Sequence, residues 1–175
     1  ERQITVWRRL ERKLPLQDTL LIGLYYNVMM AMFVRMGNLE DAKNAGQQAI
    51  SCFREEGHSY LEHFIHIHLA DLDVIEGRLI RAMRGLSTAK RCLANSGLSY
   101  GNEIEVIEII ELAILYERGD FKKVRENSAR LRESLLKGDS WSELFLQLTR
   151  ISVLSIYFTE GLQAAQEELE VFQAD

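Results

Sequence analysis

All four histidines of the chain fall in one stretch, HSYLEHFIHIHLADLD, which runs from His58 to Asp73. His63 and His66 are three residues apart, so on a helix both project from the same face. Imidazole is an ordinary zinc ligand and an ordinary general base. Three uses are therefore open for this stretch: a metal site, a catalytic site, or one wall of a binding surface.

The metal and catalytic uses lack their usual accompaniments. The HxxH pair has no general-base Glu placed as in HExxH, and carboxylate ligands such as Glu105 and Glu108 would have to come from a second helix. The acidic set around these two residues comes with no nucleophile or oxyanion donor, so a solvated helix face explains it. We predict no catalytic residue, no metal and no other cofactor.

The two cysteines occupy one column of a repeat. Cys52 and Cys92 each follow a glycine by fifteen residues, and Ser134 takes that place in the next copy. The sequence thus predicts small packing residues on separate helices, too far apart for a disulfide. Free thiols fit a reducing compartment, so we expect a cytoplasmic protein.

Composition excludes some classes of function. The 175 residues are 47% hydrophobic and 27% charged, which suits one globular unit, and the net charge is −5. We expect no direct contact with nucleic acid, because binders of DNA are usually basic. No apolar run is long enough for a membrane span.

A repeat of about 41 residues organises the chain. Its first column holds Gly37, Gly77, Gly119 and, in the fourth copy, Glu160. A small or apolar column follows at Ala42, Ala82, Val124 and Ala165, and a second set of turns at Gly57, Gly97 and Gly138. Apolar residues between the turns recur at helical spacing. Each copy is therefore predicted to be a hairpin, with first helices near 18–35, 59–76, 101–118 and 141–159 and second helices near 39–55, 79–96, 121–137 and 162–173.

The ends of the chain carry two further predictions. Residues 2–14 should form one more helix, whose segment WRRLERK exposes Trp7 for contact with a second copy, so a homo-oligomer is an open alternative. The chain begins at Glu1 and not at Met. We expect residues 1–175 to be a single domain of a larger protein.

Stacked hairpins predict an all-α solenoid of about four long hairpins, with a compact helical bundle as the alternative. Residues at the same distance along the chain from the turn column would then lie side by side in neighbouring hairpins, on a concave groove made by the first helices. That row and its neighbours are the predicted binding residues; the alternative is that they are solvated surface. They are Tyr26, Glu62, His63, His66, Glu105, Glu108, Thr149 and Arg150.

The G-x-[LF]-x-x-A columns resemble those of the tetratricopeptide repeat, lengthened by about one turn per helix. The segments SYLEHFIHIHLADLDVIEGRLIRA and WSELFLQLTRISVLSIYFTEGLQAA resemble the repeat domain of MalT-like, ATP-dependent LuxR-type transcription regulators. The resemblance implies a right-handed superhelix, and a neighbouring NTPase and helix-turn-helix domain that this chain does not contain. It assigns no functional residue.

The sequence thus predicts a non-catalytic sensing or protein-interaction domain of a bacterial regulator, which binds a small-molecule effector or a partner protein in the groove. Two alternatives stay open: a stand-alone peptide-binding adaptor, and a helical metal-dependent enzyme built on His63, His66, Glu105 and Glu108.

Overall fold

The computed structural model is helical throughout the part of the chain that it describes, with no strand among those residues. The described residues are 17–97, 102–137 and 142–173, together with Thr5, Arg9, Lys13 and Pro15. The helices are α2 (Thr19–Arg35), α3 (Leu39–Glu55), α4 (Ser59–Ile75), α5 (Leu79–Asn95), α6 (Asn102–Glu117), α7 (Phe121–Lys137), α8 (Ser142–Glu160) and α9 (Leu162–Gln173). These bounds confirm the all-α class and follow the predicted helices closely.

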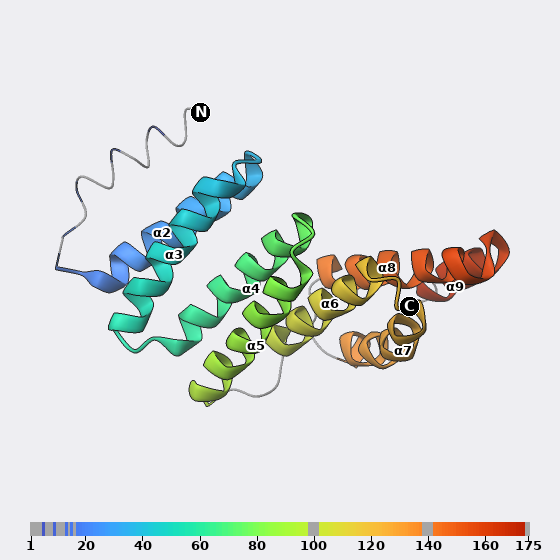
Figure 1. Ribbon diagram of the computed structural model, residues 1–175. Coiled ribbons are helices and arrows are strands. Elements are labelled where there is room, and N and C mark those ends of the chain that lie inside the picture. Colours follow the sequence, from blue (N-terminus) through green and yellow to red (C-terminus); the bar gives the residue numbers. More distant parts are fainter. Residues whose placement is uncertain are drawn as a thin grey trace.

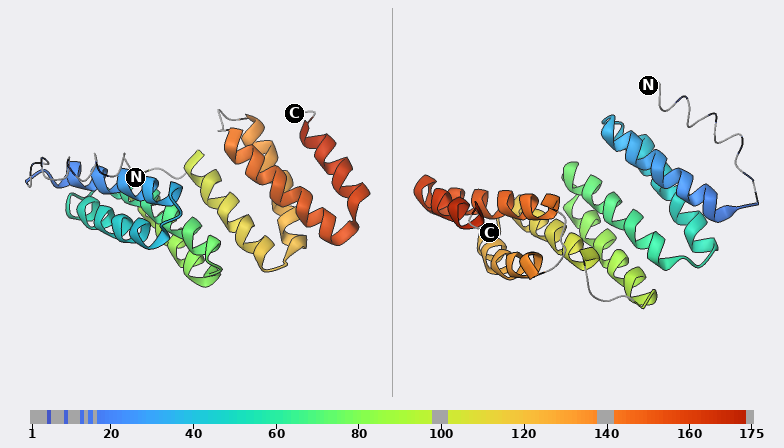
Figure 2. Two further views of the ribbon diagram at one scale, coloured as in Figure 1. Left: turned by 90° about the horizontal axis from the view of Figure 1, so that it is seen from above. Right: turned by 180° about the vertical axis from the view of Figure 1, so that it is seen from behind.

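The helices pair in chain order into a row of hairpins (Figure 1). We call α2, α4, α6 and α8 the A helices, and α3, α5, α7 and α9 the B helices. The helices α3, α5 and α7 each pack on their own A helix and on the next one along the chain, and α9 packs on α8. The A helices also meet one another, α4 with α6 and α6 with α8. The row runs from the α2–α3 hairpin at one end to the α8–α9 hairpin at the other (Figure 2).

The turns inside and between hairpins use glycine in the left-handed conformation. Gly37, Gly77 and Gly119 have φ of 72–73°, and the amides of Gly119 and Asp120 bond back to the carbonyls of Tyr116 and Leu115, both at 2.9 Å. This pairing satisfies carbonyls at the helix end that would otherwise lack donors. Asn38 then caps α3 by accepting from the Asp41 amide at 3.3 Å.

The fourth turn differs from the sequence alignment by one residue. Helix α8 continues through Glu160, and the positive φ of 93° falls on Gly161. The apolar column survives the shift, because α9 still begins at Leu162 and Ala165 is buried. Glu160 thus aligns with the turn glycines in the sequence but does not adopt the left-handed conformation. Gly161 adopts it instead, because glycine has no Cβ and avoids the steric cost.

Substitution at one of these turns should cost stability through the backbone alone. A Cβ at Gly119 would meet nothing within 4 Å, so Gly119→Ala adds only the penalty of a left-handed alanine, about 1–2 kcal/mol, partly offset by a stiffer unfolded chain. We expect a net loss of about 1 kcal/mol in urea unfolding. Gly119→Asn should lose less, because Asn tolerates this conformation. Equal stability of the Ala variant and the wild type would contradict the prediction.

Small residues stand where the helices of a hairpin come closest. Ala42, Ala82 and Val124, the predicted small column, have no accessible surface. A Cβ added to Gly85 of α5 would lie 3.2 Å from the Cβ of Ala70 on α4. The backbones of α4 and α5 can therefore approach closely, which matters for the side chains described below.

Several predictions fall on residues that the structure does not describe. The helix at 2–14 lies almost wholly outside the described residues, as do Trp7 and the predicted turn at Gly138. Both cysteines are described, and both are free thiols, half-buried at Cys52 and buried at Cys92. Within the described ranges, none of the helices combines the length and the hydrophobicity that crossing a lipid bilayer requires.

Candidate functional site

His63 is a packed residue of α4. Its side chain has no accessible surface, and its ring lies 4.9 Å from the Tyr60 ring and 4.0 Å from the Phe64 ring, measured between centroids. Because a carbonyl can only accept, Nδ1 carries the proton and donates to the Tyr60 carbonyl. Nε2 has no partner among the described residues. Burial lowers the pKa of His63, so the imidazole is neutral.

Glu62 and His66 form a pair on another face of α4. The His66 Nε2 atom lies 3.3 Å from Glu62 Oε1, and the same oxygen accepts from the Arg54 guanidinium of α3. Burial lowers the pKa of His66 in spite of this carboxylate, so its ring too is neutral at pH 7. The pair thus points toward B helices and not toward α6.

The predicted carboxylates of α6 also have partners on a B helix. Ser134 of α7 donates to Glu105 with an Oγ–Oε1 distance of 2.6 Å. Arg130 of α7 lies 3.0 Å from Glu108. Both carboxylates therefore hold α6 to its own hairpin partner.

The remaining predicted residues are dispersed. Tyr26 packs against the core of the first hairpin and lines a hollow between α2 and α3. Thr149 donates to the Phe145 carbonyl at 2.8 Å, within its own helix. Arg150 is exposed and lines a groove on the A helices. The structure therefore does not assemble the eight predicted residues into one row, and a functional role for them stays a prediction.

The A helices do form a groove, but residues other than the predicted row line most of it. Helices α4, α6 and α8 enclose a hollow of about 440 Å³ with an apolar floor and a charged rim. Its lining residues are Asp71, Val74, Ile75, Gly77, Ile109, Ile110, Ala113, Tyr116, Glu117, Gln147, Arg150 and Ile151. A second hollow of about 430 Å³ continues between α4 and α6, lined by Tyr60, Phe64, Ile67, His68, Asn102, Glu103 and Val106. We call the two hollows together the A-helix groove.

The groove stripe is offset by one residue from the predicted row. Its members lie 13, 10, 9 and 6 residues before the turn column, as Phe64, Ile67, His68 and Asp71 do in α4, whereas the predicted row lies 14 and 11 residues before it. One residue turns the side-chain direction by about 100° around a helix. One sequence feature could have indicated these positions. At the same offsets from the turn column, α6 has apolar residues, whereas α4 and α8 include charged ones.

The polar groups of the groove are spaced for binding. Asp71 and Glu117 supply negative charge on the rim, and Arg150 supplies positive charge, around Ile109, Ile110 and other apolar floor residues. At the other end, the Tyr60 hydroxyl donates to Glu103 at 2.8 Å and fixes that carboxylate in place. An amphipathic ligand with its apolar part on the floor and its charges at the rim would fit this pattern.

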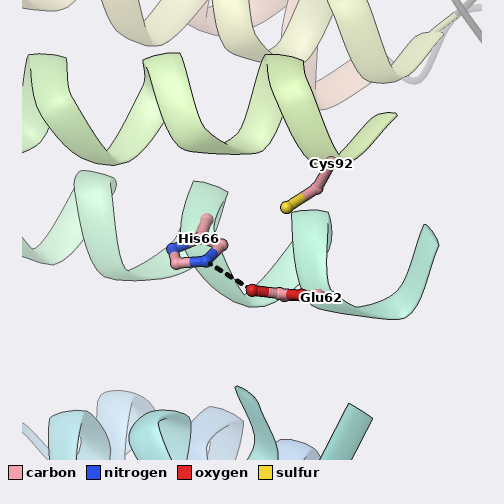
Figure 3. A group of neighbouring side chains, drawn as sticks. All are labelled: Glu62, His66 and Cys92. Atoms are coloured by element: carbon pink, nitrogen blue, oxygen red, sulfur yellow. Dashed lines mark hydrogen bonds and ion pairs between the residues drawn. The ribbon is translucent and has the colours of Figure 1, made fainter. Parts of the chain in front are cut away.

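One further cluster joins α4 to α5. Cys92 projects from α5 toward Glu62 and His66, and the ligand atoms of the three side chains lie within 4.8 Å of one another (Figure 3). Burial and the nearby Glu62 raise the pKa of the Cys92 thiol. Sequence reasoning missed this cluster, because the cysteine was interpreted as a packing residue alone.

Comparison with models of known protein families, with curated proteins and with solved structures finds no match to this chain.

Proposed function

We propose that the chain is a non-catalytic sensing or protein-interaction domain, which binds an effector molecule or a segment of a partner protein in the A-helix groove. The observation that carries this proposal is the groove itself, because its lining comes from three successive hairpins through α4, α6 and α8. Concave surfaces built in this way are where stacked helical repeats usually bind.

The proposal includes a right-handed superhelix with a period of about 41 residues. The regular turn glycines and the contacts of α6 with both α4 and α8 support this geometry. Among the described residues, the main helix contacts lie within one hairpin or between neighbouring hairpins, and the curvature of such an array is soft. A ligand that contacts three hairpins binds one curvature better than others and shifts the population toward it.

The setting of the domain is a proposal that rests on the sequence resemblance. In a MalT-like transcription regulator of the cytoplasm, a change of curvature would reach a neighbouring NTPase and a helix-turn-helix domain. A peptide-binding adaptor would use the same groove without these neighbours. The metal-dependent enzyme built on His63, His66, Glu105 and Glu108 has less support, because His63 is packed between aromatic rings and both carboxylates are bonded to α7.

Arg150→Ser should weaken binding to the groove. We would screen soluble metabolites and amphipathic peptides for a rise in melting temperature, then measure the dissociation constant of each hit. Loss of a charged hydrogen bond costs about 1.5–3 kcal/mol, or about ten- to a hundredfold in affinity. Variant affinity should therefore fall at least about tenfold.

Two control variants separate the groove from other surfaces. Arg84→Ser removes an exposed arginine of α5 that lines a different hollow, and Glu108→Gln removes a carboxylate of the row that the sequence predicts. Both should bind a hit as the wild type does. A hit that loses affinity in Glu108→Gln and keeps it in Arg150→Ser would refute the groove as the site.

A further inference from the structure

We propose that Glu62, His66 and Cys92 form a binding site for a divalent transition-metal ion of the zinc class, between α4 and α5. The three donor atoms are a carboxylate oxygen, an imidazole nitrogen and a sulfur, all within 4.8 Å of one another (Figure 3). Two of the three groups lie four residues apart on α4, and the third comes from the facing helix α5.

The donor set matches the chemistry of this class of ion. Zinc is borderline soft and takes sulfur, imidazole nitrogen and carboxylate oxygen at about 2.0–2.3 Å, usually in a tetrahedron. Tetrahedral ligands at these lengths lie about 3.3–3.8 Å apart. Donors already within 4.8 Å therefore reach the ion by side-chain rotation of roughly 1 Å. Three protein ligands leave a fourth position for water or another ligand, as in open zinc sites.

The packing of the hairpin holds the donors together. The missing side chain of Gly85 lets α5 approach α4, and a Cβ there would lie 3.6 Å from the His66 carbonyl oxygen. Glu62 and Cys92 are buried, and the His66 side chain keeps only 15% of its exposure. Donors held in place and shielded from water lose little conformational freedom when an ion binds.

The charged groups at the cluster are one buried carboxylate, Glu62, and two arginines that act on His66 and Cys92, Arg54 of α3 and Arg91 of α5, so a bound cation would replace their guanidinium groups beside the carboxylate. Glu62 is a buried carboxylate whose positive partner is Arg54 of α3, and that arginine side chain is 64% exposed. An ion at the three donors would take over the role of counter-charge, and the Arg54 guanidinium would turn outward into water. The imidazole of His66 offers a lone pair without losing a proton, and the thiol proton of Cys92 passes to solvent as the metal–sulfur bond forms.

The repeat supplies natural comparisons. In the next hairpin Ser134 stands in the column of Cys92 and bonds to Glu105, so a hydroxyl replaces the thiol. In the first hairpin Cys52 faces Gly23, whose added Cβ would lie 3.0 Å from the Cys52 Cβ, so no ligand faces that thiol from this position. Of the described hairpins, the α4–α5 hairpin alone brings sulfur, nitrogen and oxygen donors together.

Cobalt(II) is the probe that tests this site, because a cobalt–thiolate bond gives a charge-transfer band in the near ultraviolet. We would titrate the reduced, metal-free chain with Co²⁺ and then displace it with Zn²⁺. The expected result is a band that saturates at one Co²⁺ per chain and disappears when zinc is added. A wild-type chain that shows no such band at millimolar Co²⁺ would overturn the proposal.

Matched variants assign the band to these residues. Cys52→Ser removes the other thiol and should leave the band unchanged, whereas Cys92→Ser should abolish it. His66→Ala and Glu62→Gln should each weaken cobalt binding at least about a hundredfold, since loss of even an outer-shell partner costs about ten- to a hundredfold. A band that survives in Cys92→Ser, or unchanged affinity in both α4 variants, would overturn the assignment.

Circular dichroism checks that each variant is folded. If Cys92→Ser does not fold, the Cys52→Ser chain still decides the question, because Cys92 is then its sole thiol. A cobalt–thiolate band in that chain supports the site, and its absence refutes it.

Discussion

Ile107→Ala is expected to lower the free energy of unfolding by about 2–5 kcal/mol, the range for emptying a well-packed core position. Ile107 of α6 has no accessible surface and belongs to a cluster shared by α4, α5 and α6. The lost free energy has two parts. The removed side-chain carbons no longer contribute their burial, and the cavity that remains leaves its lining atoms without contacts. In the described part of the chain the main contacts join neighbouring hairpins, so distant contacts compensate little for a weakened junction.

The measurement is urea unfolding followed by circular dichroism, with two comparison variants. Ile80→Ala removes the same atoms from a side chain that is 75% exposed on α5, so it should change stability by no more than about 0.5 kcal/mol. Ile107→Val should cost about 0.5–1.5 kcal/mol. If Ile107→Ala and Ile80→Ala were equally stable, α6 would not pack on α4 and α5 as described.

The hairpins were predictable from the sequence because their determinants are local. Among the described residues, a glycine with positive φ follows six of the helices, α2 to α6 and α8, and the small column at Ala42, Ala82 and Val124 marks the close approaches of three hairpins. The one error, at Glu160, arose because column spacing does not reveal which of two adjacent residues takes the left-handed conformation. The next residue is a glycine, and glycine takes it.

The position of the A-helix groove was not predictable to the same degree. Which stripe of an A helix faces its neighbours depends on how the hairpins rotate against one another, and this rotation is a property of the packed array. A difference of one residue, about 100° around the helix, moves the prediction from the groove to the face that meets the B helices. Arg150 was the predicted residue that lies in the groove.

The face of the A helices that carries the predicted row holds them to the B helices. Glu62 pairs with Arg54 of α3, Glu105 with Ser134 of α7, and Lys90 of α5 lies 2.7 Å from Glu111. Acidic residues of the A helices thus bond to the B helices on either side. The cluster with Cys92 belongs to this face, and its three donors meet only once α4 and α5 are packed, which explains why spacing along the chain did not reveal it.

The second large effect is expected from pH and centres on His63. Its Nδ1–H donates to the Tyr60 carbonyl, so an added proton would go to Nε2, which is buried and has no acceptor among the described residues. Burial therefore lowers the pKa of His63, and the hydrogen bond to the Tyr60 carbonyl and the nearby Glu103 of α6 oppose this only in part. In the unfolded chain the imidazole has its ordinary pKa of 6.5.

The sign of the effect follows from proton binding. Between the lowered folded pKa and 6.5, the unfolded chain binds more protons, so the free energy of unfolding rises with pH. The contribution of His63 is complete above the unfolded value and is lost as pH falls toward the folded one. Each unit by which the pKa is lowered contributes about 1.4 kcal/mol. Burial also lowers the pKa of His66 and His68, so these residues steepen the rise of the free energy of unfolding with pH.

His63→Phe isolates the share of this one residue. The wild type should be less stable at about pH 5.5 than at about pH 7.5, a range above the ordinary titration of Glu and Asp. Burial raises the pKa of Asp71, which opposes this trend, so the comparison with His63→Phe carries the test. His63→Phe keeps an aromatic ring between Tyr60 and Phe64 but cannot take up a proton, so its stability should depend less on pH. His58→Gln removes an exposed imidazole before α4 and should keep the wild-type slope. Equal slopes for His63→Phe and the wild type would mean that the ring reaches water and is protonated as freely in the folded chain as in the unfolded one.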